Sequence, residues 1–226
     1  MSEYELGVFP GAKAGEIAEN FTVRDQDGNE VSLEQYSGKW VVLETDSITC
    51  SMYVKNIGGI KKLQAKYHDV EFLLIYVREA HLDARLGPHE NDQQKLEMAE
   101  KQREFYGESR KIWVDDLDGE MHKALGELPN MVYVINPDGK VIYRCNWAFS
   151  KNIDKVLANR DTLHTKEYMA IITAAPWVMI PVVSSDGWDA LWDLLIALPM
   201  IAVAHLKADW QNLKSKMGGC QIEAAE

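Results

Sequence analysis

The chain is poor in cysteine and has no closely spaced pair of cysteines. Its three, Cys50, Cys145 and Cys220, are spread over 226 residues, so they make no disulfide framework, and at least one thiol stays unpaired in the monomer. The residue three places after Cys50 is Tyr53, which excludes a dithiol exchanger of the CxxC type. Because such cysteine usage suits a reducing compartment, we expect the protein to be cytoplasmic.

Runs of basic residues are equally absent. Lys and Arg number 24 against 35 Asp and Glu, which gives a formal net charge of -11. Since that charge repels phosphate backbones, we expect no nucleic-acid partner. The first 21 residues lack a basic start followed by an apolar core, so we expect no signal peptide. The apolar segments 168–183 and 190–206 contain proline and are shorter than the roughly 20 residues of a spanning helix, so we also expect no transmembrane span.

Strand-like and helix-like segments alternate along residues 1–162. The order is a β-α-β half followed by a β-β-α half, which predicts an α/β, thioredoxin-like fold with a central mixed sheet flanked by helices. Pro129 occupies the place where that arrangement has a cis-proline. Glycines 58 and 59 inside the first long helix predict a kink or a close contact. The expected strands are 21–24, 31–33, 40–45, 70–77, 111–116, 131–135 and 140–145, and the expected helices are 50–67, 93–106, 117–125 and 153–159.

Residues 163–226 differ in composition from the rest of the chain and are rich in apolar side chains. We expect a helical C-terminal extension there, distinct from the domain at 1–162. Three roles stay open for it: packing on the domain itself, a homodimer interface, or binding along a membrane surface. Few Lys or Arg flank the apolar segments, which disfavours the membrane surface.

Cys50 follows an apolar strand and begins the first long helix. A cysteine at the first turn of a helix meets unpaired backbone N–H groups and the positive end of the helix dipole, and both favour the nucleophilic thiolate. Ser47 and Thr49 can add hydroxyl donors. The alternative is a small buried cysteine of the core. Cys145 ends a strand and is expected to be a packed thiol, whereas Cys220, in the tail, is a candidate resolving thiol or an inert residue.

Glu79, His81 and His89 lie in the loop after the second buried strand. In the expected fold this loop begins at the same sheet edge as Cys50, which makes its side chains candidate acid–base or substrate-binding groups. The alternative for each is an ordinary solvated loop residue. The spacing of Cys and His matches no metal-binding pattern, so we expect no metal.

Four segments together resemble the iodothyronine deiodinase family, particularly its bacterial deiodinase-like redoxins, over about residues 20–160: TDSITCSMYVKNI, LLIYVREAH, GPH and LPNMVYVINPDGKVIYRCNW. In this resemblance Cys50 falls on the reactive position, His81 on the histidine of the EAH motif, His89 near a second family histidine, and Glu79 on an acidic residue of the motif. Ser51 stands where the family usually has proline. The resemblance implies reductive removal of iodine from an aromatic ring, with no bound cofactor. An external thiol reductant, a dithiol or one of thioredoxin or glutathione type, would restore Cys50.

Two other functions remain open. A one-cysteine peroxide reductase would use a Pro-x-x-x-Thr/Ser-x-x-Cys loop and an arginine near the thiolate; Ser47 fits this loop, Leu43 replaces its proline, and Arg144 is the candidate arginine. A binding module would present a loop or the C-terminal extension on the same scaffold. A Cys50 pKa near the ordinary 8.5 would favour the binding module, and a clearly lowered pKa would count against it.

Overall fold

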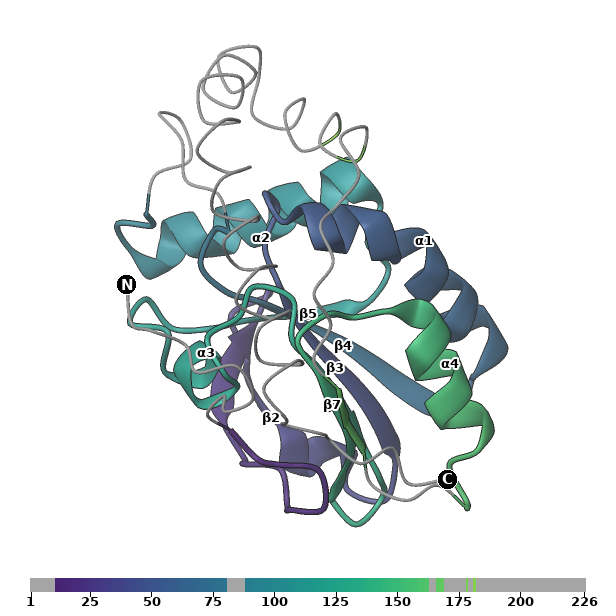
Figure 1. Cartoon of the computed structure of the whole chain (residues 1–226). Helices are drawn as coiled ribbons and strands as arrows, with labels where there is room; N and C mark the ends of the chain where they lie inside the picture. Colours follow the sequence, from purple (N-terminus) through teal and green to yellow (C-terminus); the bar gives the residue numbers. More distant parts are fainter. Residues whose placement is uncertain (1–10, 81–87, 163–165, 169–177, 179–180, 182–226) are drawn as a thin grey trace, which may run out of the picture.

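The computed structural model describes residues 11–80, 88–162, 166–168, 178 and 181 (Figure 1). Within these residues one mixed sheet has the strand order β2-β1-β5-β4-β3-β6-β7-β8. Its centre is the parallel set β5-β4-β3, and β6 runs antiparallel to β3. The strands are β1 Thr22–Asp25, β2 Glu30–Ser32, β3 Trp40–Asp46, β4 Val70–Tyr76, β5 Lys111–Val114, β6 Val132–Ile135, β7 Val141–Cys145 and β8 Lys166–Tyr168, and the helices are η1 Leu33–Tyr36, α1 Ser51–Lys66, α2 Asp92–Tyr106, α3 Glu120–Ala124 and α4 Ser150–Ala158.

Neighbouring side chains of β3 show which helices cover which face of the sheet. Val42 packs in one cluster with Ile60 of α1 and Ile153 of α4, whereas Leu43 packs with Met121 just inside α3. Successive side chains of a strand point to opposite faces. Helices α1 and α4 therefore lie on one face and α3 on the other (Figure 1), and the predicted mixed sheet flanked by helices is confirmed.

Helices α1 and α4 approach each other closely at the second of the two glycines in α1. A Cβ atom on Gly59 would lie 2.6 Å from the Cβ of Ser150, the first residue of α4, and closer still to its Oγ. A Cβ atom on Gly58 would meet nothing within 4 Å. The close contact expected from the sequence is thus confirmed at Gly59, while Gly58 faces open space.

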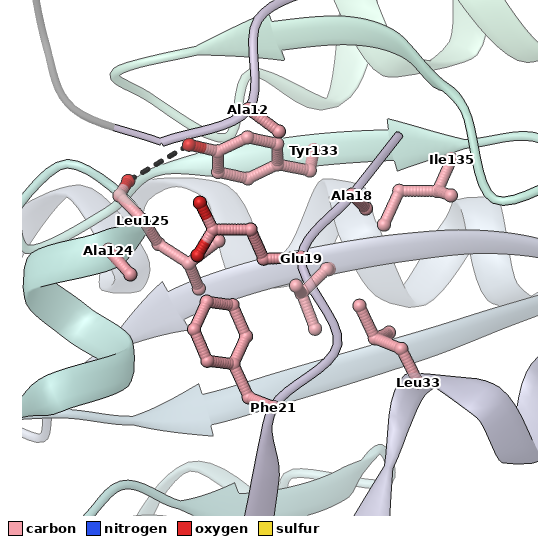
Figure 2. Close-up of a pocket in the computed structure, with 10 residues that line it drawn as sticks. Ala12, Ala18, Glu19, Phe21, Leu33, Ala124, Leu125, Tyr133 and Ile135 are labelled. Atoms are coloured by element: carbon pink, nitrogen blue, oxygen red, sulfur yellow. Dashed lines mark hydrogen bonds between the residues drawn. The ribbon is translucent and has the colours of Figure 1, made fainter. Parts of the chain in front are cut away.

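A small cavity lies on the α3 face of the sheet, beneath the N-terminal segment (Figure 2). Its volume is about 10 Å³, room for about one water molecule. The Tyr133 hydroxyl, in its wall, donates a hydrogen bond to the Leu125 carbonyl oxygen at 3.0 Å. Because the cavity is so small and lies across the sheet from α1, it does not serve as a substrate pocket for Cys50.

The structure changes two expectations, one for the region after residue 162 and one for the peptide bond before Pro129. Strand β8 pairs in parallel with β7, so the sheet continues past residue 162 with a strand, inside a region expected to be helical. The Leu128–Pro129 bond is trans, which is the more stable form of most X–Pro bonds, so the expected cis-proline is wrong.

The part of the chain that the structure describes contains no helix with both the length and the apolar character of a membrane span. Apart from residues 178 and 181, the remainder of the C-terminal extension, with its proposed dimer interface, lies outside the described residues.

Candidate active site

Cys50 lies at the head of α1, as the sequence predicts. It is the N-cap residue, with an extended backbone (φ -79°, ψ 110°). Its N–H donates to the Ser47 carbonyl oxygen at 3.2 Å, and its own carbonyl oxygen accepts from the Val54 N–H at 3.3 Å. Cys50 is only 2% exposed and packs with Met52 and Tyr53 of α1. The thiol is therefore held inside the protein at the end of β3.

The environment of Cys50 disfavours its thiolate form. Burial raises its pKa well above the ordinary value, and the negative charge of Asp46 raises it further. The backbone N–H groups of Met52 and Tyr53 lower it, as expected at a helix N-terminus, but they do not outweigh burial. The lowering effect of the helix N-terminus inferred from the sequence is therefore present, but the net shift of the Cys50 pKa is upward. The sequence shows the helix dipole but not the burial.

A pair of carboxyl groups on β3 faces the same side as the cysteine. Asp46 accepts hydrogen bonds from Asn130 Nδ2 at 2.6 Å and from the Ser47 N–H at 2.8 Å. The same Asn130 Nδ2 donates to Glu44 Oε1 at 2.8 Å, and Asn130 Oδ1 accepts from the Ala148 N–H at 2.9 Å. Burial raises the pKa of Asp46 well above its usual range, and the charge of Glu44 adds to this. Asp46 was missed in the sequence analysis, although an acid at the end of a buried strand is the signal that could have indicated it.

A buried arginine pairs with Glu44 and with a further acid, Glu108, beneath α1. The Arg110 guanidinium contacts the Glu44 carboxylate and donates to Glu108 Oε2 at 2.7 Å. The Tyr53 hydroxyl donates to the same Glu108 oxygen at 2.9 Å. Burial raises the pKa of Glu108, but the charge and hydrogen bonds of Arg110 outweigh it and bring that pKa to about 2. Glu108 is thus ionised and paired with the arginine at neutral pH.

The loop after β4 is hydrogen-bonded to the segment between β3 and α1 that contains Cys50. Asp46 and Tyr76 are opposite each other in the parallel register of β3 and β4. Just beyond them, the Val77 N–H donates to the Asp46 carbonyl oxygen at 2.8 Å, and the Ala80 N–H donates to Ser47 Oγ at 3.0 Å. These bonds hold the start of the loop beside the head of α1, as the order of strands predicts.

A network of polar side chains begins at Thr49, the residue next to Cys50, and extends away from it. The Thr49 hydroxyl and N–H donate to Glu79 Oε2 at 2.6 Å and 3.2 Å. The Tyr76 hydroxyl donates to the other oxygen of Glu79. That hydroxyl lies 3.5 Å from His89 Nε2, whose ring packs edge-on against the tyrosine ring. The structure thus joins two predicted site residues, Glu79 and His89, through Tyr76, which was missed in the sequence analysis.

Burial shifts the pKa of each titratable group in this network towards its uncharged form. Burial raises the pKa of Glu79 even though Thr49 and Tyr76 stabilise its carboxylate. Burial and the charge of Glu79 raise the pKa of Tyr76 well above its usual range. Burial and the charge of Lys95 lower the pKa of His89 to about 4. His89 is therefore neutral at neutral pH, and its 3.7 Å approach to Glu79 is not an ion pair.

The structure does not bring Arg144 to the cysteine. Its chain neighbours Tyr143 and Cys145 pack in the cluster shared with α1 and α4, so Arg144 points to the opposite face, where its Nη1 donates to the Gly11 carbonyl oxygen at 3.1 Å. The arginine expected for peroxide chemistry therefore lies across the sheet from Cys50. Cys145 is fully buried, as expected of a packed thiol.

The remaining predicted residues divide into two groups. Ser51 is the first residue of α1, and Pro129 precedes the Asn130 that bonds the carboxyl pair; both are partly exposed. His81 and Cys220 lie outside the described residues, so their roles stay predictions. Within the ranges that the structure describes, no three His, Cys, Asp or Glu side chains converge as metal ligands do.

The order of the sheet, with a single cysteine at the β3–α1 junction, defines a thioredoxin-like protein. A model of the iodothyronine deiodinase family matches residues 2–160, and the chain belongs to that family. The resemblance inferred from the sequence is confirmed. Membership supports a thiol-dependent oxidoreductase that needs no bound cofactor and uses a thiol reductant.

Three individual proteins are similar to parts of this chain. A chloroplastic protein of Arabidopsis thaliana named as a glutathione peroxidase 7 is 31% identical over 70 residues, which cover 31% of this chain and 30% of that protein. A Chlorobium tepidum structure named as a thiol:disulfide interchange protein DsbE has a TM-score of 0.52 at 18% identity, covering 66% of this chain and 98% of that one. A thiol peroxidase from Chromobacterium violaceum has a TM-score of 0.50 at 14% identity, covering 68% and 92%. At these identities the two structures show the shared fold alone.

Proposed function

We propose that this protein removes iodine reductively from an iodinated aromatic compound, with Cys50 as its single reactive cysteine. The observation that carries the proposal is the network of side chains Thr49–Glu79–Tyr76–His89, which begins at the residue next to Cys50. It supplies proton-carrying groups beside a nucleophile, which is what replacement of a ring-bound iodine by hydrogen requires.

The first step transfers iodine from carbon to sulfur. The Cys50 sulfur attacks the iodine atom, the carbon–iodine bond breaks, and a sulfur–iodine bond forms. The electron pair of the broken bond stays on the ring carbon, which takes up a proton. Glu79, whose pKa burial raises, is the proposed proton donor, and Tyr76 and His89 reload it. His81, by its place in the family motif, is a further candidate for this role.

External thiols then regenerate the enzyme. One thiol attacks the sulfur of the sulfenyl iodide, which releases iodide and a proton and leaves a mixed disulfide on Cys50. A second thiol, from the same dithiol or another molecule, resolves that disulfide and restores the Cys50 thiol. In total two thiols are oxidised to one disulfide for each ring carbon reduced. As a resolving thiol, Cys220 would instead attack the sulfenyl iodide, which releases iodide and a proton and forms a Cys50–Cys220 disulfide, and an external dithiol would reduce that disulfide.

The test is iodide release from an iodinated thyronine with excess dithiol. We expect release by the wild-type protein and none by Cys50→Ser, because serine does not form the sulfenyl iodide. A matched Cys145→Ser variant, at the packed thiol, separates loss of the reactive thiol from loss of any thiol. Release that persists in Cys50→Ser would overturn the assignment to this cysteine, and no release from the wild-type protein would overturn the proposed reaction.

Peroxide reduction is the second candidate function. The similarity to the Arabidopsis thaliana protein named as a glutathione peroxidase supports it, whereas the position of Arg144 across the sheet counts against it. Mixing the protein with equimolar hydrogen peroxide and trapping sulfenic acid at Cys50 separates the two reactions. Fast trapping without iodide release favours the peroxidase. Failure of both reactions favours a binding module on the same scaffold.

A further inference from the structure

The proposed chemistry requires Cys50 to lose a proton inside the protein. The thiol is 2% exposed, so water does not readily take that proton. The Asp46 carboxyl group lies in the same turn: Asp46 Oδ1 accepts from the Ser47 N–H at 2.8 Å, and the Ser47 carbonyl oxygen accepts from the Cys50 N–H at 3.2 Å. The charge of Asp46 acts on the Cys50 thiol. Asp46 is not exposed at all, and no step of the deiodination described above uses it.

Hydrogen bonds fix how the Asp46 carboxyl group is oriented. Asn130 Oδ1 accepts from the Ala148 N–H at 2.9 Å, and only the amide nitrogen of an asparagine side chain donates. The Nδ2 group must therefore face the carboxyl pair, where it holds Asp46 Oδ2 at 2.6 Å. The Ser47 N–H holds the other oxygen at 2.8 Å. The acid is thus held rigidly beside the head of α1.

The surrounding charges leave Asp46 able to take up a proton. From its own strand it faces Glu44, whose negative charge opposes its ionisation. Arg110 is the cation that acts on it, but that guanidinium is already engaged with Glu44 and Glu108. The other titratable neighbours are the Tyr53 hydroxyl from α1 and the Tyr76 hydroxyl from β4, both uncharged at neutral pH.

We propose that Asp46 is the internal proton acceptor of Cys50. In the step, the S–H bond of Cys50 breaks and an O–H bond forms on the Asp46 carboxylate, which turns a thiol and a carboxylate into a thiolate and a carboxylic acid. Nothing is oxidised or reduced, and the net charge of the site does not change. The low dielectric of the interior favours such a transfer over loss of the proton to bulk water. Asn130 and Glu44 act through Asp46 and are positioning residues.

This arrangement makes Asp46 and Cys50 titrate as a coupled pair. Between the two pKa values of the pair a single proton is shared, and a fixed minority of molecules carries it on the carboxyl group with the thiolate free. The rate of alkylation follows the thiolate, so its logarithm should rise with pH, level off while the proton is shared, and rise again. An isolated thiol gives one uninterrupted tenfold rise per pH unit below its pKa.

The experiment is the pH dependence of Cys50 alkylation by iodoacetamide, followed by mass spectrometry of the Cys50 peptide. We expect the level region in the wild-type protein and its loss in Asp46→Asn. In that variant the midpoint of the single rise should be lower, because the charge that opposes the thiolate is gone, with about tenfold faster alkylation for each pKa unit lost. Asp154→Asn, in α4 and paired with Lys66 at the far end of α1, is the matched control and should keep the wild-type profile. A wild-type profile without the level region, or one unchanged in Asp46→Asn, would overturn the proposal.

Glu44→Gln keeps the proposal open to refutation if Asp46→Asn does not fold. Loss of the Glu44 charge lowers the pKa of Asp46, so the level region should begin at lower pH. An unchanged onset would contradict the role of Asp46. The proposal rests on Cys50 as the nucleophile, but its test uses no iodinated substrate. A level region without iodide release would support Asp46 as the proton acceptor and contradict the deiodination. Iodide release without a level region would support the deiodination and contradict the role of Asp46.

Discussion

Replacement of Gly59 by alanine tests the contact between α1 and α4. A Cβ atom at this position would lie 2.6 Å from Ser150 Cβ, about 1 Å inside the usual separation of roughly 3.5–4.0 Å between carbon atoms. Neither Cβ can rotate away, because each is fixed to the backbone of its helix. The two helices must therefore move apart or bend.

The magnitude follows from two opposing effects. Alanine is favoured over glycine inside a helix by about 1 kcal/mol, whereas overpacking of a close contact costs about 1–3 kcal/mol. Because the clash involves backbone-fixed atoms, we take the upper half of that range and expect a net loss of about 1–2 kcal/mol. The neighbouring Gly58, whose added Cβ meets nothing within 4 Å, should gain about 0.5–1 kcal/mol on the same substitution.

Urea unfolding followed by circular dichroism gives both free energies of unfolding at a common slope. The expected difference between Gly58→Ala and Gly59→Ala is therefore about 1.5–3 kcal/mol, although both changes have the same helix propensity. The double variant Gly59→Ala with Ser150→Gly removes the opposing atoms and should recover most of the loss. A Gly59→Ala protein as stable as the wild type would refute the reasoning.

Three further predictions concern the buried polar groups. Arg110→Met should lower the free energy of unfolding by about 3–5 kcal/mol, because it leaves two buried carboxylates without their cation; a loss below about 1 kcal/mol in urea unfolding would contradict the pairing. Glu79→Gln should slow iodide release about 10²-fold or more with little change in the urea midpoint, because it removes the proposed proton donor; an unchanged rate would exclude that role. His89 and His122 both have a pKa lowered to about 4 from 6.5. Between these two pH values the unfolded chain binds more protons than the folded protein, so the free energy of unfolding should fall as the pH drops from 6.5 to about 4. His89→Gln should make this fall shallower, separately from the pH-independent loss of the ring contact with Tyr76. Identical slopes in unfolding at a series of pH values would count against a neutral buried His89.

The sequence by itself determined the fold and the place of the cysteine. Continuous apolar strands such as β3 and β4, joined by helix-forming segments, have few ways to be covered on both faces. The same local order puts Cys50 at the head of a helix and Glu79 at the same sheet edge, since the carboxyl ends of neighbouring parallel strands lie together. These features depend on short-range patterns, which a sequence displays directly.

Only the tertiary structure decided the electrostatics of the site. The helix dipole at Cys50 is local and visible in the sequence, but the burial and the Asp46 carboxyl group that outweigh it come from distant packing. Asn130 lies 84 positions from Asp46 along the chain, yet they meet at 2.6 Å. Arg144, a candidate by residue type alone, was placed on the far face by the strand to which it belongs. Contacts between segments far apart in the chain set pKa values and proton paths, because Coulomb and hydrogen-bond energies depend on distance in space and on burial.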